Sequence, residues 1–272
     1  MGGSRPDPGA VVCVDGVFET VLVLEGRAVD AARHFARLAG AARSLGISLP
    51  RDVGGERELA GLARRLSAAN GLAVGAAGFR ASVSRGPRAP GPLSPPRGGP
   101  TLVASAFPVA APRAPVAAAK VAIARNLVFS PSPSTRHKTL SSIHRVAGRF
   151  EAETRGLDEV VLADAAGRLA EACGHHLFLL GPDGVFFTPP LSLGILPGVT
   201  RGFLLSALPG RAAERDLGAD DVARARAAFL TGALRGVWPV GTLEGRPLGT
   251  EEPERVRRLW IDSLESRSEE GA

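Results

Sequence analysis

Residues 196–201 read Leu-Pro-Gly-Val-Thr-Arg, and this stretch does most to decide the fold. Pro197-Gly198 turns the chain, and an apolar run suited to a helix begins directly at Val199. The backbone N–H groups of Val199 and Thr200 would then point outward from the positive end of the helix dipole, which favours a bound phosphate. A simple helix start without a ligand is the alternative interpretation.

Strand and helix patterns surround this turn on both sides. Hairpins are predicted over 159–163 with 168–172, around Ala165-Ala166-Gly167, and over 177–180 with 185–188, around Pro182-Asp183-Gly184. Apolar periodicity predicts helices over 140–155, which Gly156 closes, and over 199–208, 219–227 and 252–267.

The N-terminal part of the chain has its own alternation of elements. Strands are predicted over 17–25, 79–84 and 101–107, helices over 27–46 and 56–69, and a Pro/Gly-rich loop over 85–100. Residues 108–115 have the composition of a linker, and a strand over 116–128 and a Pro/Ser turn region over 130–134 follow. We therefore expect a mixed α/β protein with a small domain over 1–110, a linker over 111–116 and a large domain over 117–272.

Composition narrows the class of function. The 272 residues are 44% hydrophobic and 22% charged, as in a soluble globular protein, and no apolar run is long enough to span a membrane. Residues 1–9 lack the apolar core of a secretory signal, and two cysteines favour a reducing, cytoplasmic compartment. The net charge of +6 is spread along a chain without tyrosine, so we expect anionic small molecules and not nucleic acid as ligands. Metal binding is not expected, because the adjacent His175 and His176 would point to opposite faces of a strand.

Lysine is rare in this chain. Of the 33 basic residues, only Lys120 and Lys138 are lysines, and arginine cannot form a Schiff base. Lys138 follows Arg136 and His137, two cations that would favour the nucleophilic, neutral amine. Lys138 is therefore a candidate imine-forming lysine; a solvated loop lysine is the alternative.

Two more charged residues occupy positions that suit a cofactor. Glu171 lies on a predicted strand of small residues, where its carboxylate could keep a cationic ring nitrogen protonated. Arg37, one residue from the apolar stripe of the first helix, could reach a phosphate. The alternatives are an outward-facing charge on a half-buried hairpin for Glu171 and a solvated helix-edge arginine for Arg37.

Taken together and in order, these places resemble the class IV aminotransferases, the family that holds branched-chain aminotransferase, D-amino acid aminotransferase and aminodeoxychorismate lyase. The segments that carry the resemblance cover about residues 14–249 and are Asp15-Gly16-Val17-Phe18-Glu19-Thr20, His34-Phe35-Ala36-Arg37-Leu38, Lys138-Thr139-Leu140, Gly156-Leu157-Asp158-Glu159, Glu171 through Phe178, Phe187-Thr188-Pro189-Pro190, Leu196 through Arg201, and Phe229 through Val240.

The resemblance implies a fold type IV enzyme with pyridoxal 5'-phosphate held between a small and a large domain, usually as a homodimer. It implies that Lys138 is the catalytic, Schiff-base lysine, that Glu171 pairs with the pyridine nitrogen, and that Arg37 with the amides of Val199 and Thr200 binds the phosphate. The stretch from Ser84-Arg85-Gly86 to Arg88 and Gly91 loosely resembles the lyase subgroup, so Arg85 and Arg88 are candidate ligands of a substrate carboxylate.

Several departures from the family pattern lean away from a branched-chain aminotransferase, and a missing tyrosine and threonine favour an aminodeoxychorismate lyase, which would convert 4-amino-4-deoxychorismate to 4-aminobenzoate and pyruvate. Cys13 replaces an aromatic residue, and the tyrosine that aminotransferases often carry after the lysine is missing at Ser142 and Ile143. His176 replaces an asparagine, and Ala233 replaces a phosphate-binding threonine. An aminotransferase of the branched-chain or D-amino acid type, and a non-catalytic relative acting as a binding subunit, are the alternatives.

Overall fold

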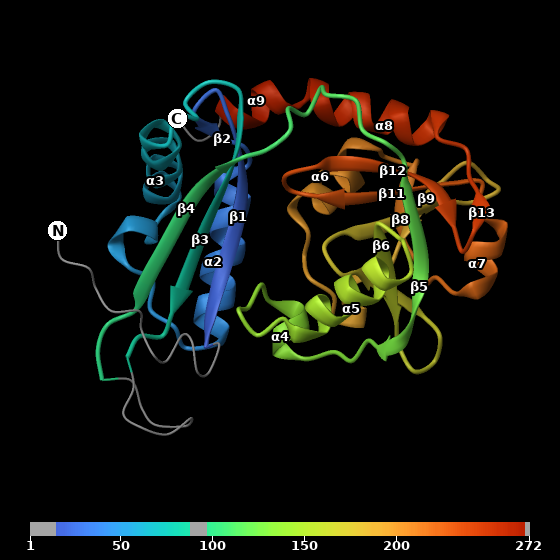
Figure 1. Cartoon of the computed structure of the whole chain (residues 1–272), viewed down its shortest axis with the longest axis horizontal. Coiled ribbons are helices and arrows are strands. Elements are labelled where there is room, and N and C mark those ends of the chain that lie inside the picture. The colour runs from blue at the N-terminus through green and yellow to red at the C-terminus, as the bar shows by residue number, and fades with distance from the viewer. Residues whose placement is uncertain (1–14, 88–96, 270–272) are drawn as a thin grey trace. The chain divides into compact units, whose positions relative to one another are not determined.

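The computed structural model describes residues 15–87 and 97–269 (Figure 1). Its elements follow in chain order: β1 (Gly16–Leu24), β2 (Arg27–Ala28), α2 (Ala31–Ser44), η1 (Arg51–Val53), α3 (Glu56–Ala69), β3 (Ala76–Ser84), β4 (Thr101–Pro108), β5 (Ala119–Val128), α4 (Pro133–Arg136), α5 (Ile143–Thr154), β6 (Glu159–Ala163), β7 (Leu169–Ala172), β8 (His176–Leu180), β9 (Phe186–Thr188), η2 (Leu191–Leu193), α6 (Val199–Ala207), β10 (Ala212–Glu214), α7 (Ala219–Arg224), β11 (Ala227–Gly232), β12 (Gly236–Leu243), β13 (Arg246–Pro247), α8 (Glu251–Asp262) and α9 (Leu264–Glu269).

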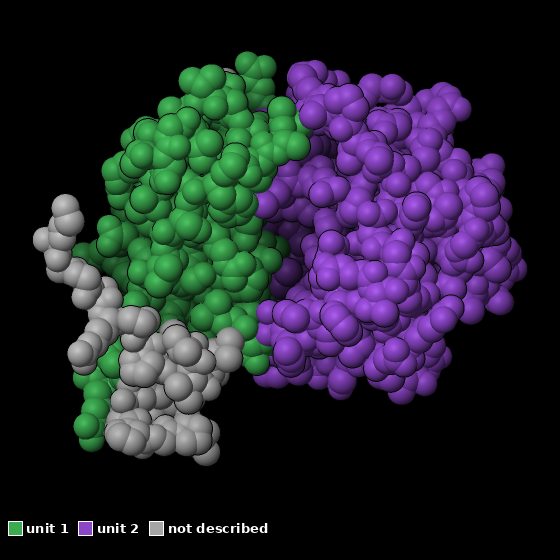
Figure 2. All heavy atoms as spheres, in the orientation of Figure 1, with its two compact units in different colours: residues 1–111, 137–141, 265–272 green, residues 112–136, 142–264 purple. Residues whose placement is uncertain are grey.

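The described chain divides into two compact units (Figure 2). Unit 1 contains the N-terminal residues up to 111, residues 137–141 and the residues from 265 onward, and unit 2 contains residues 112–136 and 142–264. The segment that carries Lys138 therefore belongs to the compact unit formed by the N-terminal residues, although it lies well beyond residues 111–116 in the sequence.

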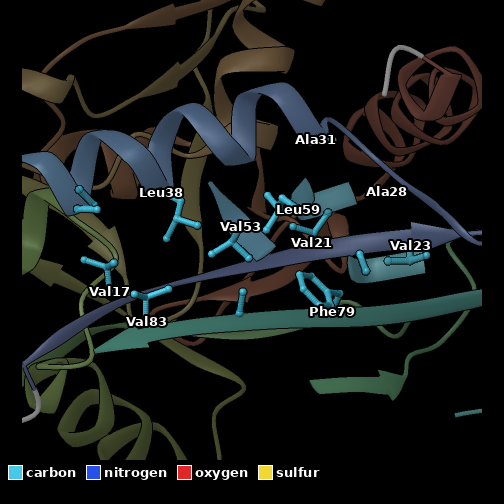
Figure 3. Packing of buried hydrophobic residues seen from close by; sticks show 14 of the residues in the cluster. Val17, Val21, Val23, Ala28, Ala31, Leu38, Val53, Leu59, Phe79 and Val83 are labelled. Atoms are coloured by element: carbon cyan, nitrogen blue, oxygen red, sulfur yellow. The ribbon is translucent and has the colours of Figure 1, made fainter. Parts of the chain in front are cut away.

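Unit 1 is built on an antiparallel sheet with the strand order β2-β1-β3-β4. Strands β1 and β3 pair along nine residues each, from Gly16 opposite Ser84 to Leu24 opposite Ala76. Residues alternate between the two faces of a strand, so Val17, Val21 and Val23 all face the same side. Helices α2 and α3 cover that side and enclose a core with Leu38, Leu59 and Phe79 (Figure 3).

The first helix begins later than its apolar pattern predicts. Glu25 and Gly26 both have positive φ, 47° and 74°, which is the backbone of a tight hairpin turn. Arg27 and Ala28 then pair with Leu24 and Val23 as β2. The prediction of helix from residue 27 is therefore wrong for its first turn, because the hairpin uses those residues.

Unit 2 contains a nine-stranded mixed sheet within the described residues, ordered β10-β9-β8-β11-β12-β5-β6-β7, with β13 beside β12. Both predicted hairpins are present as β6 with β7 and β8 with β9. Helix α6 also begins at Val199, as the Pro-Gly turn predicts. The core of this unit collects residues from strands distant in sequence, including Val121, Val161, Leu177, Leu230 and Val240.

Some predictions in this region were wrong at their ends. The helix predicted over 219–227 stops at Arg224, because Ala227 pairs with Leu180 at the start of β11. The predicted C-terminal helix divides into α8 and α9. In the described part of the chain, none of the helices is both long and apolar enough to cross a membrane.

Candidate active site

Lys138 is held by backbone pairing with β1. The Phe18 N–H donates to the Lys138 carbonyl at 2.8 Å, the Leu140 N–H donates to the Gly16 carbonyl at 2.9 Å, and Thr139 forms a bridge with Val17. A Cβ atom on Gly16 would lie 2.6 Å from Leu140 Cδ1 and 2.6 Å from the carbonyl oxygen of Val83, so the close approach of the lysine segment and β3 to β1 requires glycine at that position. Lys138 is half-buried, and an isolated β-bridge joins the lysine segment to β1.

Two cations share the aromatic ring of Phe18. Lys138 Nζ lies 4.4 Å and Arg80 Cζ 3.8 Å from the ring centroid, both within the range of cation–π attraction. The register explains the position of Arg80: Ser82 is directly opposite Phe18, and Arg80 is two residues further along the same face of β3.

Arg80 also stands out electrostatically. It is half-buried, and burial lowers its pKa below the ordinary arginine value. Its Nε contacts Ser82 Oγ at 3.4 Å, and no carboxylate among the described residues pairs with it. A half-buried cation on the ring that Lys138 also contacts is suited to binding an anion.

Arg37 is held by a buried carboxylate on β1. Its Nε donates to Glu19 Oε2 at 2.9 Å and its Nη2 donates to Glu19 Oε1 at 2.6 Å, and His34 Nδ1 lies 3.1 Å from Glu19 Oε1. Burial alone would raise the pKa of Glu19, but Arg37 and His34 together hold it far below its usual range. The side chain of Arg37 is only 10% exposed, so it is not the solvated arginine of the alternative interpretation.

Glu171 is buried on β7, with its side chain 2% exposed, so the outward-facing alternative is wrong. Arg145 Nη2, from α5, donates to Glu171 Oε1 at 2.5 Å. The Leu196 N–H donates to Glu171 Oε2 at 3.3 Å, and His176 Nδ1 lies 3.8 Å from the same oxygen. The carboxylate is thus fixed by groups from three different elements or loops.

The Pro-Gly turn before α6 is part of the same cluster. A Cβ atom on Gly198 would lie 2.4 Å from the ring of His176, so the imidazole packs against the bare glycine backbone. Among the described residues, no side chain caps the N-terminus of α6. The His176 departure therefore fills the space between Glu171 and the turn that precedes Val199.

Thr200 connects α6 to the end of β11. Its Oγ1 donates to the Gly232 carbonyl at 3.3 Å, and Ala233 follows directly. Val199 and Thr200 are both buried, with 8% and 4% of their surfaces exposed. The first turn of α6 and the β11–β12 turn are therefore neighbours in unit 2.

The two candidate substrate ligands are placed differently. Arg85 Nε donates to Asp15 at 2.8 Å, and its terminal nitrogens donate to the carbonyls of Leu45 and Gly46, both at 2.7 Å. These contacts tie the end of β3 to the end of α2. Arg88, like Cys13, lies outside the described residues.

Each unit thus assembles part of the predicted set: Lys138 and Arg37 around Phe18 and Glu19 in unit 1, and Glu171, Val199 and Thr200 around Leu196 in unit 2. Sequence reasoning did not identify Arg80 and Arg145. The pairing of β1 with β3, which brings Arg80 to Phe18, was not predicted from the sequence, and only tertiary contacts bring Arg145 to Glu171.

Comparison with known proteins identifies the family. The model of the class IV amino-transferases matches residues 16–243, so the chain belongs to this family. A protein of Methanocaldococcus jannaschii, provisionally named a branched-chain-amino-acid aminotransferase, is 29% identical over 254 residues, covering 90% of this chain and 84% of that protein. The branched-chain-amino-acid aminotransferase of Pseudomonas aeruginosa is 29% identical over 126 residues, covering 44% of this chain and 40% of that enzyme.

Solved structures agree on the fold. The branched-chain amino acid aminotransferase of Escherichia coli superposes with a TM-score of 0.84 at 21% identity, covering 96% of this chain and 89% of that one. A Legionella pneumophila protein provisionally named a 4-amino-4-deoxychorismate lyase superposes with a TM-score of 0.83 at 22% identity, covering 100% of this chain and 97% of that one. A hypothetical aminotransferase of Mycobacterium tuberculosis in its PLP-bound form superposes with a TM-score of 0.80 at 25% identity, covering 97% of this chain and 93% of that one. The predicted fold type IV architecture and membership of a family of pyridoxal-phosphate-dependent enzymes are confirmed.

Proposed function

We propose that this protein is a pyridoxal-phosphate-dependent lyase of the aminodeoxychorismate lyase type. The observation that carries the proposal is the placement of Lys138 and Arg80 on one aromatic ring, 4.4 and 3.8 Å from its centroid. This arrangement puts a candidate covalent amine and a guanidinium suited to a carboxylate on the same ring, and a carboxylate-bearing amino substrate requires both groups.

The chemical types of these residues suit pyridoxal phosphate. Lys138 would supply the amine, and buried Glu171 would supply a carboxylate for the ring nitrogen. Arg37 and the backbone amides of Val199 and Thr200 would bind the phosphate. When bound, pyridoxal phosphate supplies an electron-withdrawing ring that stabilises negative charge on the carbon bearing the substrate amine.

The residues of this chain would perform the proton transfers. With cofactor and substrate bound, Lys138 Nζ would remove the proton from the amine-bearing carbon. The carbon–oxygen bond to the enolpyruvyl group then breaks, with the electrons leaving on oxygen, and Lys138 returns a proton as pyruvate forms and the remaining ring aromatises to 4-aminobenzoate. Arg80 binds a substrate carboxylate during these steps. Arg85 is a weaker candidate for that role because Asp15 and two carbonyls already engage it.

Lys138 can be tested against a matched control. Borohydride reduction of the holoenzyme should leave an adduct on Lys138 and abolish the visible absorbance. Lys138→Ala should give no adduct and no visible absorbance before reduction. Lys120→Ala, which replaces the exposed and only other lysine, should give the same adduct and the same absorbance as the wild type. If no adduct forms after added cofactor, the protein is a non-catalytic family member that acts as a binding subunit.

An aminotransferase with the same lysine is the second candidate, because the relatives from Methanocaldococcus jannaschii and Pseudomonas aeruginosa are named for that activity. The absence of tyrosine from the chain favours the lyase, since family aminotransferases often carry one shortly after the lysine. Pyruvate release from 4-amino-4-deoxychorismate without an added keto acid supports the lyase. Turnover of a branched-chain or D-amino acid that depends on a keto acid supports the aminotransferase.

We also propose that the protein forms a homodimer through α5. Ile143, Val146 and Phe150 lie on one side of this helix and are 76%, 59% and 70% exposed. Such an apolar stripe on a helix indicates an interaction surface. Val146→Asp should convert dimer to monomer in light scattering, whereas Val74→Asp, at an exposed valine 81% accessible in unit 1, should not. A monomeric wild-type protein would exclude this proposal.

A further inference from the structure

Arg145 forms an ion pair with the carboxylate that the proposed function assigns to the cofactor ring. Its Nη2 is 2.5 Å from Glu171 Oε1, and its Nη1 donates to the Cys173 carbonyl at 2.9 Å. Two hydrogen bonds to different acceptors fix the plane of the guanidinium, so the pair is geometrically defined and not a transient surface contact.

The environment makes this pair electrostatically strong. The Glu171 side chain is 2% exposed and that of Arg145 20%, so water and salt screen their attraction weakly. The other carboxylate oxygen accepts a hydrogen bond from the Leu196 N–H. Glu171 therefore has much of its negative charge compensated within unit 2.

The other ionisable groups near Glu171 do not offset the positive charge of Arg145. His176 Nδ1 lies 3.8 Å from Glu171 Oε2 and, if protonated, would add positive charge. Burial raises the pKa of Cys173 to about 12, so its thiol is neutral. Burial, together with Arg145, lowers the pKa of His144 and so disfavours a positive charge on this imidazole.

The two remaining carboxylates near Cys173 have partners of their own. Glu159 lies 2.8 Å from His175, and Glu151 lies 2.7 Å from Arg155. Neither has a contact with Arg145 among the ion pairs of the described residues. Glu171 is thus the carboxylate with which Arg145 pairs.

From this arrangement we propose that Arg145 is a positioning residue that lowers the proton affinity of the cofactor's ring nitrogen by sharing Glu171 with it. This inference rests on the proposed function. A buried carboxylate that pairs with two cations neutralises the charge of each cation less than it would neutralise a single one. A positive charge on the ring nitrogen is therefore disfavoured. A ring that withdraws electrons less strongly suits a lyase, because the electrons of the broken C–H bond leave with the departing oxygen.

The direct test is the nitrogen chemical shift of ¹⁵N-labelled pyridoxal phosphate bound to the holoenzyme, followed as a function of pH. Arg145→Gln keeps hydrogen-bond donors but removes the charge, and should raise the pH at which the ring nitrogen loses its proton by about 1–3 units. Arg145→Lys restores a positive charge and should return the titration towards that of the wild type. Arg149→Gln is the matched control, since Arg149 lies four residues along the same helix and pairs with Glu153 in solvent.

The wild-type protein also provides a test that does not depend on the folding of a variant. Its ring nitrogen should lose its proton within the pH range over which the protein stays folded, and a nitrogen that remains protonated throughout overturns the inference. Equal titrations in the wild type and Arg145→Gln overturn it as well, while the borohydride adduct on Lys138 leaves the proposed function intact. Absence of that adduct overturns both.

Discussion

At the residue scale, Glu19 is a buried carboxylate whose pKa is strongly lowered by its cationic neighbours. It is fully buried between β1 and α2, and its ionised form depends on Arg37 and His34. Because its folded-state pKa is depressed, the pair stabilises the protein at pH values above the unfolded pKa of about 4.3, and this stabilisation declines as the pH falls through the acidic range.

Glu19→Gln should therefore lower the free energy of unfolding by about 3–5 kcal/mol at neutral pH, because it leaves Arg37 buried without its anionic partner. Denaturant unfolding at several pH values checks this. The difference from wild type should shrink as the pH falls from about 5 towards 2, since Glu19 of the unfolded chain then gains a proton while Glu19 of the folded protein stays ionised. Glu25→Gln, which alters the exposed carboxylate directly after the same strand, should have little effect at any pH. A difference independent of pH would contradict the assignment of the stabilisation to charge.

At the element scale, α5 illustrates how close packing selects a residue against its local preference. Gly148 lies in the interior of this helix, where glycine is unfavourable by about 1 kcal/mol relative to alanine. A Cβ atom there would lie 2.1 Å from Cys173 Sγ and 3.4 Å from Val160. The absence of a side chain lets α5 approach β6 and the end of β7 closely.

Gly148→Ala should accordingly destabilise the protein by about 1–3 kcal/mol despite the gain in helix propensity. Gly40→Ala in α2 is the matched control, because a Cβ atom at Gly40 meets no atom within 4 Å among the described residues. That substitution should stabilise by about 0.4–1 kcal/mol. Thermal unfolding of both variants under identical conditions compares them, and equal shifts in the two would show that packing against Cys173 is not limiting.

At the scale of the whole molecule, the last described helix, α9, contacts the residue that directly precedes the first helix, α2. Arg267 on α9 pairs with Asp30, both buried, and the Asp30 N–H donates to the Arg267 carbonyl at 3.1 Å. Asp30 precedes α2 and has a positive φ of 52°, a conformation that costs energy outside glycine. The α9 contact thus supports the strained start of the first helix in unit 1.

Arg267→Ala should increase hydrogen exchange throughout α2, because it leaves the buried Asp30 carboxylate without this cation, at a cost of about 3–5 kcal/mol. Exchange followed by mass spectrometry measures the effect on the peptides that cover residues 31–44. Arg258→Ala, at an exposed arginine of α8, should leave those peptides unchanged. Protection in α2 that survives Arg267→Ala would show that α9 does not support this helix.

Sequence reasoning succeeded where short-range chemistry decides the outcome. The helix over 56–69, the start of α6 at Val199 and the hairpins around Gly167 and Pro182-Asp183-Gly184 all follow from periodicity and turn residues within a few positions. It failed for β11 and the start of α2. There, partners remote in the sequence or a competing hairpin outweigh local preference.

By itself, the sequence determined the family, the cofactor lysine candidate and the candidate carboxylate, because these depend on residue types that cannot be exchanged: an amine, a buried acid and a Pro-Gly turn. The tertiary structure alone decided the electrostatics of the site. Arg80 reaches the ring beside Lys138 through strand register, and Arg145 reaches Glu171 by the packing of α5 near β7. Charges interact over distances in space and not in sequence, so only the folded chain shows which cation faces which carboxylate.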